Sequence, residues 1–216
     1  MPFPDRLTPT PLSARHPWRG SFAALLIGMW AGLAAADQER MPAPRVFAAS
    51  DGAVAFAMLP PALDARTQRV VREGRGVLYD LRADGSWRAR YRTQGWYASE
   101  LFVSADGRTL VRLGPWQRGK AIAPDHLALA FHRDGKLLRQ YRVAELVKDP
   151  TAVRATVSHY FWRLDEVSGE EGGVDAPRLS DVDGTFTLKT IDGIEYVFGL
   201  EDGAIRRTDP PVIVRR

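Results

Sequence analysis

The dipeptide Asp-Gly recurs between apolar runs along this 216-residue chain and limits the folds open to it. It occurs at seven aspartates: Asp51, Asp84, Asp106, Asp134, Asp183, Asp192 and Asp202. Glycine takes positive φ without steric cost, and an aspartate side chain bonds to nearby backbone, so the pair is a strong hairpin signal. We interpret these aspartates as turn residues rather than as metal ligands or catalysts. The pattern predicts an all-β fold of antiparallel hairpins in a twisted open sheet or sandwich.

Side-chain alternation predicts how the strands pair. A bulged turn at Asp84-Gly85, with Gly85 left-handed, places apolar residues on one face and Asp80 opposite Arg88 on the other. Trp87 is then expected in the core. The same type of turn is predicted at Gly107, Gly135 and Gly193. The predicted pairs are Leu81–Trp87, Tyr79–Ala89, Val77–Tyr91, Leu101–Val111, Phe102–Leu110, Phe131–Leu137, Leu127–Tyr141, Leu188–Tyr196, Phe186–Phe198 and Lys189–Glu195.

The segment LFVSADGRTLVRL, residues 101–113, is apolar on both faces, which predicts a central strand covered on two sides. Its S-x-D-G-x-x-L cadence at Ser104–Leu110 resembles the turns of WD-type and other β-propeller proteins. The D-G-x-x-Y-V-F stretch at Asp192–Phe198 resembles a segment near the end of uncharacterised secreted bacterial proteins. These resemblances imply propeller-blade-like hairpins. No Trp-Asp signature follows a strand and the Asp-Gly spacing is irregular, so an open sheet is expected rather than a closed propeller.

Two segments depart from the hairpin pattern. Residues 143–149 contain good helix formers followed by Pro150, which predicts one short helix. Residues 163–181 are polar, acidic and rich in glycine, which predicts a long exposed loop.

The N-terminal segment resembles an export signal. Arginines precede an apolar run that ends in the small residues Ala34 and Ala36, after which polar residues begin. The apolar run of 21–36 is shorter than the roughly 20 residues of a spanning helix, although an uncleaved anchor remains the alternative. We therefore expect a signal peptide at 1–36 with cleavage before Asp37, a flexible leader at 37–45 and a single β-rich domain at 46–216. The expected location is periplasmic or extracellular, and the composition has a bacterial character.

Composition excludes several classes of chemistry. The chain has no cysteine, so disulfides, thiolate zinc sites and cysteine nucleophiles are excluded. The formal net charge is +4, but removal of the first 36 residues leaves a nearly neutral chain with mixed charges. No basic run stands out, and no nucleic-acid partner is expected.

Searches for a catalytic or metal motif identify no site residues. His126, His132 and His159 lack ligand spacing, and the serines lack a G-x-S-x-G elbow. For an EF-type loop, Asp181, Asp183 and Gly184 would take the third, fifth and sixth positions, but Leu179 and Thr190 would then stand where carboxylates are needed. We expect no catalytic residue, no bound metal and no cofactor; weak calcium binding by the acidic loop is the alternative.

Three tryptophans are the remaining candidates for binding: Trp96 follows Gly95, Trp116 follows Pro115, and Trp162 ends the aromatic run 159–162. Trp96, Trp116 and Trp162 could form a stacking platform for sugars or a peptide groove, or could cap the ends of the core. The binding residues therefore stay unidentified.

Two functions fit these observations. The first is an exported, non-enzymatic β module that binds or scaffolds an envelope or extracellular partner, either a protein or a polysaccharide. The alternative is an extracytoplasmic hydrolase acting on a polymer, with a site assembled only in three dimensions near His159, Asp165 and residues 163–181. No membrane span is expected after processing.

Overall fold

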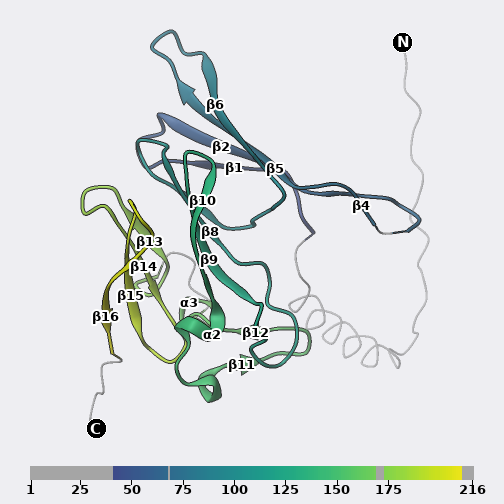
Figure 1. The fold of residues 1–216 in the computed structure, drawn as a ribbon, viewed down its shortest axis with the longest axis vertical. Coiled ribbons are helices and arrows are strands. Elements are labelled where there is room, and N and C mark those ends of the chain that lie inside the picture. Colours follow the sequence, from purple (N-terminus) through teal and green to yellow (C-terminus); the bar gives the residue numbers. More distant parts are fainter. Residues whose placement is uncertain (1–40, 68, 169–172, 211–216) are drawn as a thin grey trace, which may run out of the picture. The chain divides into compact units, whose positions relative to one another are not determined.

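The structure, a computed structural model, describes residues 41–67, 69–168 and 173–210. The expected signal peptide and residues 37–40 of the expected leader lie outside these residues. Strands dominate, and the sheets are antiparallel, as the Asp-Gly pattern predicted (Figure 1). The fold class is therefore confirmed.

Three four-stranded sheets contain most of the strands in the described residues. The first contains β1 (Arg45–Ala48), β2 (Val54–Leu59), β5 (Arg75–Leu81) and β6 (Trp87–Gln94). The second contains β7 (Leu101–Val103), β8 (Thr109–Leu113), β9 (Leu127–Arg133) and β10 (Lys136–Arg142). The third contains β13 (Arg178–Ser180), β14 (Thr185–Lys189), β15 (Glu195–Gly199) and β16 (Ile205–Asp209). In each sheet the strands lie in chain order, the arrangement found in propeller blades.

Shorter elements connect these sheets. The hairpin of β3 (Ala62–Leu63) and β4 (Val70–Arg72) is inserted between β2 and β5 and projects away from the first sheet (Figure 1). Between the second and third sheets lie α2 (Val143–Leu146), the 3-10 turn η1 (Pro150–Ala152), β11 (Arg154–Ala155), β12 (Tyr160–Phe161) and α3 (Asp165–Ser168). The helix predicted over 143–149 is thus confirmed but shorter. The exposed loop predicted over 163–181 is wrong at its two ends, because α3 and β13 form there.

β8 and β9 of the second sheet are buried on both faces, so the central strand predicted within 101–113 is confirmed for β8. β7 is instead an edge strand of this sheet, and β10, at the other edge, is mostly exposed. Leu110 packs with Phe56 and Leu78 of the first sheet. Residues on the other face, including Phe131, pack with Phe186 and other aromatic residues of the third sheet. The two hydrophobic cores therefore lie on opposite sides of β8 and β9.

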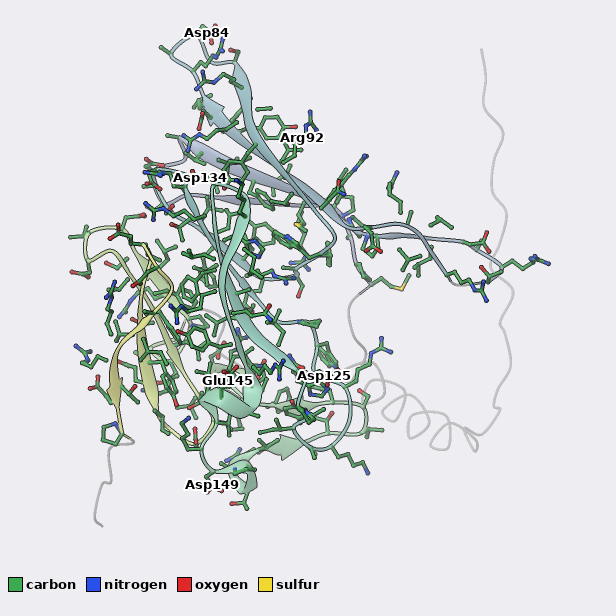
Figure 2. The ribbon with its side chains drawn as sticks, in the orientation of Figure 1. Asp84, Arg92, Asp125, Asp134, Glu145 and Asp149 are labelled. Atoms are coloured by element: carbon green, nitrogen blue, oxygen red, sulfur yellow. The ribbon has the colours of Figure 1, made fainter. Side chains whose placement is uncertain are left out.

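The predicted hairpin turns are confirmed in their glycines. Gly85, Gly107, Gly135 and Gly193 all have positive φ. Figure 2 shows Asp84 and Asp134 at hairpin tips. The pairs predicted between β14 and β15 are also found, including Phe186 with Phe198 and Lys189 with Glu195.

The β5–β6 hairpin follows the predicted register only near its tip. Leu81 lies opposite Trp87 and Tyr79 opposite Ala89, but an irregularity then places Val77 opposite Arg92 instead of Tyr91. An extra residue in one strand shifts the following side chains to the other face. Tyr91 consequently packs in the core, whereas Leu81 and Trp87 are 44% and 49% exposed. The prediction that Trp87 is a core residue was wrong.

Two further registers were predicted wrongly. Asp134 itself has a φ of 50°, so Asp134-Gly135 forms a two-residue turn in which both residues are left-handed. The resulting pairs are Leu137 with His132 and Tyr141 with Leu129. At the β7–β8 turn the pairs shift by one residue to Leu101–Arg112, Phe102–Val111 and Val103–Leu110. There the Ser104 hydroxyl accepts a hydrogen bond from Thr109 N, which closes a longer loop.

A polar cluster lies between the first and second sheets. His132 is buried, its ring centroid lies 4.9 Å from that of Trp96, and the Arg112 guanidinium lies 4.9 Å from the Trp96 ring centroid. Burial, together with the Arg112 charge, lowers the pKa of His132 to about 4. His132 is therefore neutral in the folded protein at pH 7.

Replacement of Gly107 by alanine should destabilise the protein more than the same change at Gly85. Both residues are left-handed, which costs an L-residue about 1–2 kcal/mol. A Cβ at Gly85 would meet open space, whereas a Cβ at Gly107 would lie 2.9 Å from side-chain atoms of Val54, Leu78 and Arg90. We expect Gly107→Ala to cost roughly 1–3 kcal/mol more than Gly85→Ala in urea unfolding. Equal losses would contradict this packing.

Acidification should destabilise the protein through His132. An unfolded histidine has a pKa of about 6.5, so between about pH 6.5 and 4 the unfolded chain binds the proton more readily than the folded chain. The free energy of unfolding should fall across this window by roughly 3 kcal/mol more than in His132→Leu, which has no imidazole to titrate. Urea unfolding of both proteins at pH 7 and pH 4 measures the difference. Identical losses in the two proteins would show that His132 does not titrate in this way.

Candidate functional site

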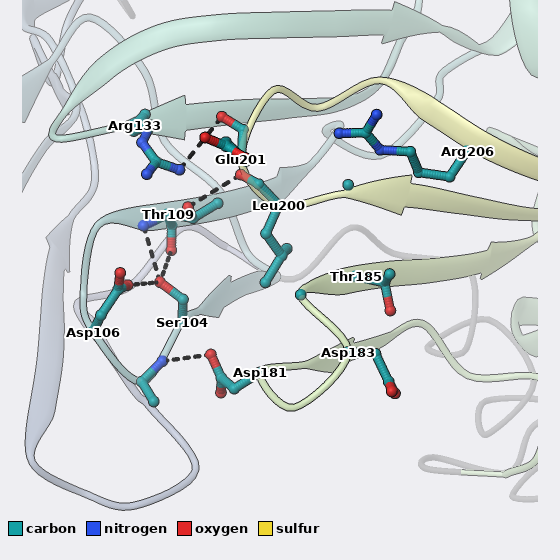
Figure 3. A pocket seen from close by; sticks show the side chains of 13 residues that line it. Ser104, Asp106, Thr109, Arg133, Asp181, Asp183, Thr185, Leu200, Glu201 and Arg206 are labelled. Atoms are coloured by element: carbon teal, nitrogen blue, oxygen red, sulfur yellow. Dashed lines mark hydrogen bonds between the residues drawn. The ribbon is translucent and has the colours of Figure 1, made fainter.

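Three Asp-Gly turns lie around one open groove of about 670 Å³ (Figure 3). They are the β7–β8 turn with Asp106, the β13–β14 turn with Asp183, and the β15–β16 turn, which follows Glu201. The groove is lined by Ser104, Ala105, Asp106, Thr109, Arg133, Asp181, Asp183, Gly184, Thr185, Gly199, Leu200, Glu201 and Arg206.

Hydrogen bonds across this groove tie the second sheet to the third. The Asp181 carboxylate accepts from Ala105 N at 2.8 Å, and Thr109 Oγ1 donates to Leu200 O at 3.2 Å (Figure 3). Burial would raise the pKa of Asp106, but hydrogen bonds from Ser104 Oγ and Arg108 N hold it below its ordinary value. The polar groups of the groove therefore act on one another, and we interpret the groove as a structural junction.

A second cavity, of about 300 Å³, has aromatic walls and charged groups. We call it the aromatic pocket. It is lined by Ser99, Glu100, Leu113, Gly114, Pro115, Trp116, Gln117, His159, Tyr160, Phe161, Trp162, Arg163 and Glu166. These residues come from three segments: the approach to β7, the chain that leaves β8, and the chain around β12.

Close backbone packing positions the first wall of the aromatic pocket. Gly114 N donates to Ala128 O, and a Cβ on Gly114 would lie 1.8 Å from Leu127 O, so only glycine fits. Gln117 is buried and donates from Nε2 to Leu127 O at 2.6 Å. Trp116 is held between these two anchors and is half-buried.

His159 packs directly against Trp116 in the lining of the aromatic pocket. Its ring centroid lies 3.8 Å from that of Trp116 and 4.8 Å from that of Phe161. The His159 Nδ1 atom is 2.7 Å from Thr156 Oγ1. The rings of His159 and Trp116 are tilted by 43°, and those of His159 and Phe161 meet edge to face at 85°. Such a group of aromatic rings offers an apolar surface on which a flat ligand face can pack.

Arg163 brings three carboxylates together at the base of the aromatic pocket. Its guanidinium nitrogens lie 2.9 Å from Glu100, 3.3 Å from Asp165 and 3.4 Å from Glu166, and its side chain is only 8% exposed. Glu166 Oε2 also accepts from the backbone nitrogens of Trp162 and Arg163. One buried cation thus faces three anionic groups.

Burial and neighbouring charges change the ionisation of two of these carboxyl groups. Burial raises the pKa of Asp165 and of Glu166, and the Arg163 charge offsets only part of the effect. Each carboxylate also raises the pKa of a neighbour by repulsion: Glu100 acts on Asp165, and Asp165 acts on Glu166. A cation that entered the aromatic pocket would relieve this repulsion.

The histidines predicted from the sequence are dispersed. His126 Nδ1 lies 2.6 Å from Tyr160 Oη, His132 lies between the first and second sheets, and His159 lines the aromatic pocket. Asp165 contacts Arg163 beneath the same pocket, so His159 and part of the 163–181 segment do lie near one another as the hydrolase hypothesis requires. Residues 169–172 lie outside the described residues.

The three tryptophans differ in their surroundings. Trp162 is buried in the core shared with the third sheet, and Trp96 stacks on Phe56. Trp116 alone of the three stays half-exposed at a cavity.

The aspartates considered for calcium binding lie at the groove. Asp181 accepts a hydrogen bond from Ala105 N, and Asp183 lines the groove. Within the described ranges no three His, Asp or Glu residues are grouped so that they could hold a metal ion.

Sequence reasoning missed Glu100, Arg163 and Glu166. Glu100 and Arg163 are far apart in the chain, and no local spacing connects them. The sequence contains a weak signal for Glu166. A glutamate three residues after the residue that caps a helix start often accepts a hydrogen bond from that residue's backbone N–H, as Glu166 does from Arg163.

No helix among the described residues is long and apolar enough to cross a membrane.

Comparisons with known proteins give a structural likeness only. No protein-family model and no curated protein matches the sequence. Among solved structures, the Dos1 propeller is similar, with a TM-score of 0.39 and 10% sequence identity. The match covers 76% of this chain and 32% of that chain, so this chain spans about a third of the propeller.

Proposed function

We propose that the chain is exported and that its β domain is a binding module for an amine-bearing sugar of an envelope or extracellular polymer. The aromatic pocket is the binding site. The observation that carries the proposal is the buried cluster at its base, where Arg163 meets Glu100, Asp165 and Glu166.

The charges favour a cationic group. An ammonium near Glu100 would bring a positive charge next to a carboxylate, and a hydrogen bond between charged groups is stronger than a neutral one. Glu100 is the most exposed of the three carboxylates, so it is the one that an entering ligand meets.

The aromatic wall favours a ring. Trp116 stands beside polar side chains that include Gln117 and Glu100, and flat aromatic surfaces combined with a few polar groups are typical of ligand sites. The cavity of about 300 Å³ is at the small end of ligand pockets, which suits one sugar unit.

The hydrolase alternative has one supporting observation. A carboxyl group whose pKa is raised by burial, as in Glu166, is suited to act as a general acid. The backbone hydrogen bonds that Glu166 accepts favour a structural role, so we place binding first. Release of reducing ends from a polymer, lost in Glu166→Gln and kept in Trp87→Ala, would reverse this order.

Glucosamine should bind about tenfold more tightly than glucose, a difference of roughly 1.4 kcal/mol. The two sugars differ at one position, where an ammonium replaces a hydroxyl, so the comparison isolates the charge. Calorimetric or NMR titration at a pH at which the amine is protonated measures both affinities. Glu100→Gln should reduce the preference, and Trp116→Ala should weaken binding of both sugars.

Trp87→Ala is the matched control, because it removes an exposed tryptophan outside the aromatic pocket. It should leave both affinities unchanged. Equal affinity for the two sugars, or glucosamine binding unaffected by both pocket variants, would contradict the proposed function.

A further inference from the structure

The outer face of the first sheet is apolar across all four strands. Its inner face, which includes Phe56 and Leu78, packs in the core shared with the second sheet. Alternation along the strands places the other residues on the opposite face. These outer residues are Val46, Ala48, Ala55, Ala57, Leu59, Val77, Tyr79, Leu81, Trp87 and Ala89.

The strand register makes this outer face continuous. One row runs from Val46 through Ala57 and Val77 to Arg92. The next row is Ala48, Ala55, Tyr79 and Ala89, and beyond it Leu81 lies opposite Trp87. Val46, Leu81 and Trp87 are 70%, 44% and 49% exposed. A water-exposed sheet face normally carries polar residues, so this row pattern marks an interaction surface.

Arginines border the outer face. Arg92 ends one row and Arg75 lies opposite Leu59, and both are exposed. Neither forms an ion pair with another described residue. The whole segment 41–99 contains nine arginines, no lysine and five acidic residues. The surface thus combines an apolar centre with a positive border.

We propose that the outer face of the first sheet is the docking surface for a protein partner that presents an apolar patch bordered by carboxylates. Trp87 and Tyr79 are the anchors, since aromatic residues and arginine dominate binding energy at protein interfaces. The alanines between them have small side chains, so the side chains of a partner can pack directly against the strands. This surface is separate from the aromatic pocket and does not depend on the proposed sugar binding.

Charge argues for such a partner over a second copy of this chain. Two copies docked by this face would bring the positive borders of both together, whereas carboxylates would pair with them. Each guanidinium of the border can bind a carboxylate of the partner with two parallel hydrogen bonds, which gives the contact direction as well as charge.

A photo-crosslinking residue placed at Ala48 or Ala89 of the full chain, in the cells that make it, tests the docking surface. Both positions are exposed on the outer face, and Leu137, an exposed apolar residue on β10, is the matched control position. We expect one protein adduct from both outer positions and not from Leu137. The crosslinked protein, once purified, should bind the purified chain directly.

Variants then separate docking from other causes of capture. Arg92→Glu and Trp87→Ala should each weaken the purified complex by about tenfold, and added salt should weaken it further. Leu137→Ser and Trp116→Ala should leave it unchanged, and thermal melting confirms that every variant is folded.

Four outcomes would overturn the inference. The first two are the absence of an adduct at both outer positions and an adduct of twice the chain's own mass, which would indicate a second copy. The third is a complex whose affinity is unchanged by Arg92→Glu and by Trp87→Ala. The fourth is binding to phosphatidylglycerol vesicles that requires Trp87, without a protein adduct.

Discussion

Burial of β8 and β9, the two central strands of the second sheet, on both faces is the constraint from which the rest of the structure follows. β8 and β9 carry apolar residues on both sides, so they are stable only when one sheet covers each face. The turn before β8 and the turn after β9 also make the contacts with the first sheet. Gly107 lies against Val54 and Leu78 of the first sheet, and Gly135 lies against Tyr91. The glycine of each turn thus permits both the reversal of the chain and the approach of the neighbouring sheet.

The aromatic pocket is a consequence of the same packing. The chain leaves β8 at Gly114, whose backbone presses on Leu127, and this places Trp116 beside His159. Arg163 follows the short strand β12 and reaches Glu100 just before β7. The residues of the pocket therefore depend on the second sheet for their positions, although none of them lies in a hairpin turn.

The positions of the turns could be predicted from the Asp-Gly pairs. The strand registers could not, because they depend on backbone conformations that the local sequence does not specify. Gly85 and Gly193 follow the expected geometry because an Asp-Gly pair has few alternatives. The left-handed φ of Asp134 and the extra residue near Arg90 shift the pairing by one position, and nothing in the local sequence separates these hairpins from the others. Arg163, Glu100 and Glu166 were not predictable at all, because only the folded chain brings them together. The apolar alternation of the outer face was visible in the sequence, but the side that the core would cover was not.

The ionisation of Glu166 tests the account of the aromatic pocket most directly. The carboxyl carbon of Glu166 can be followed by NMR through a pH titration, first in the free protein and then with saturating glucosamine. We expect the pKa of Glu166 to lie above the ordinary value in the free protein and to be lower in the complex, because the bound ammonium stabilises the ionised carboxylate. An ordinary pKa in the free protein, or the same pKa with and without the sugar, would contradict the proposed binding site.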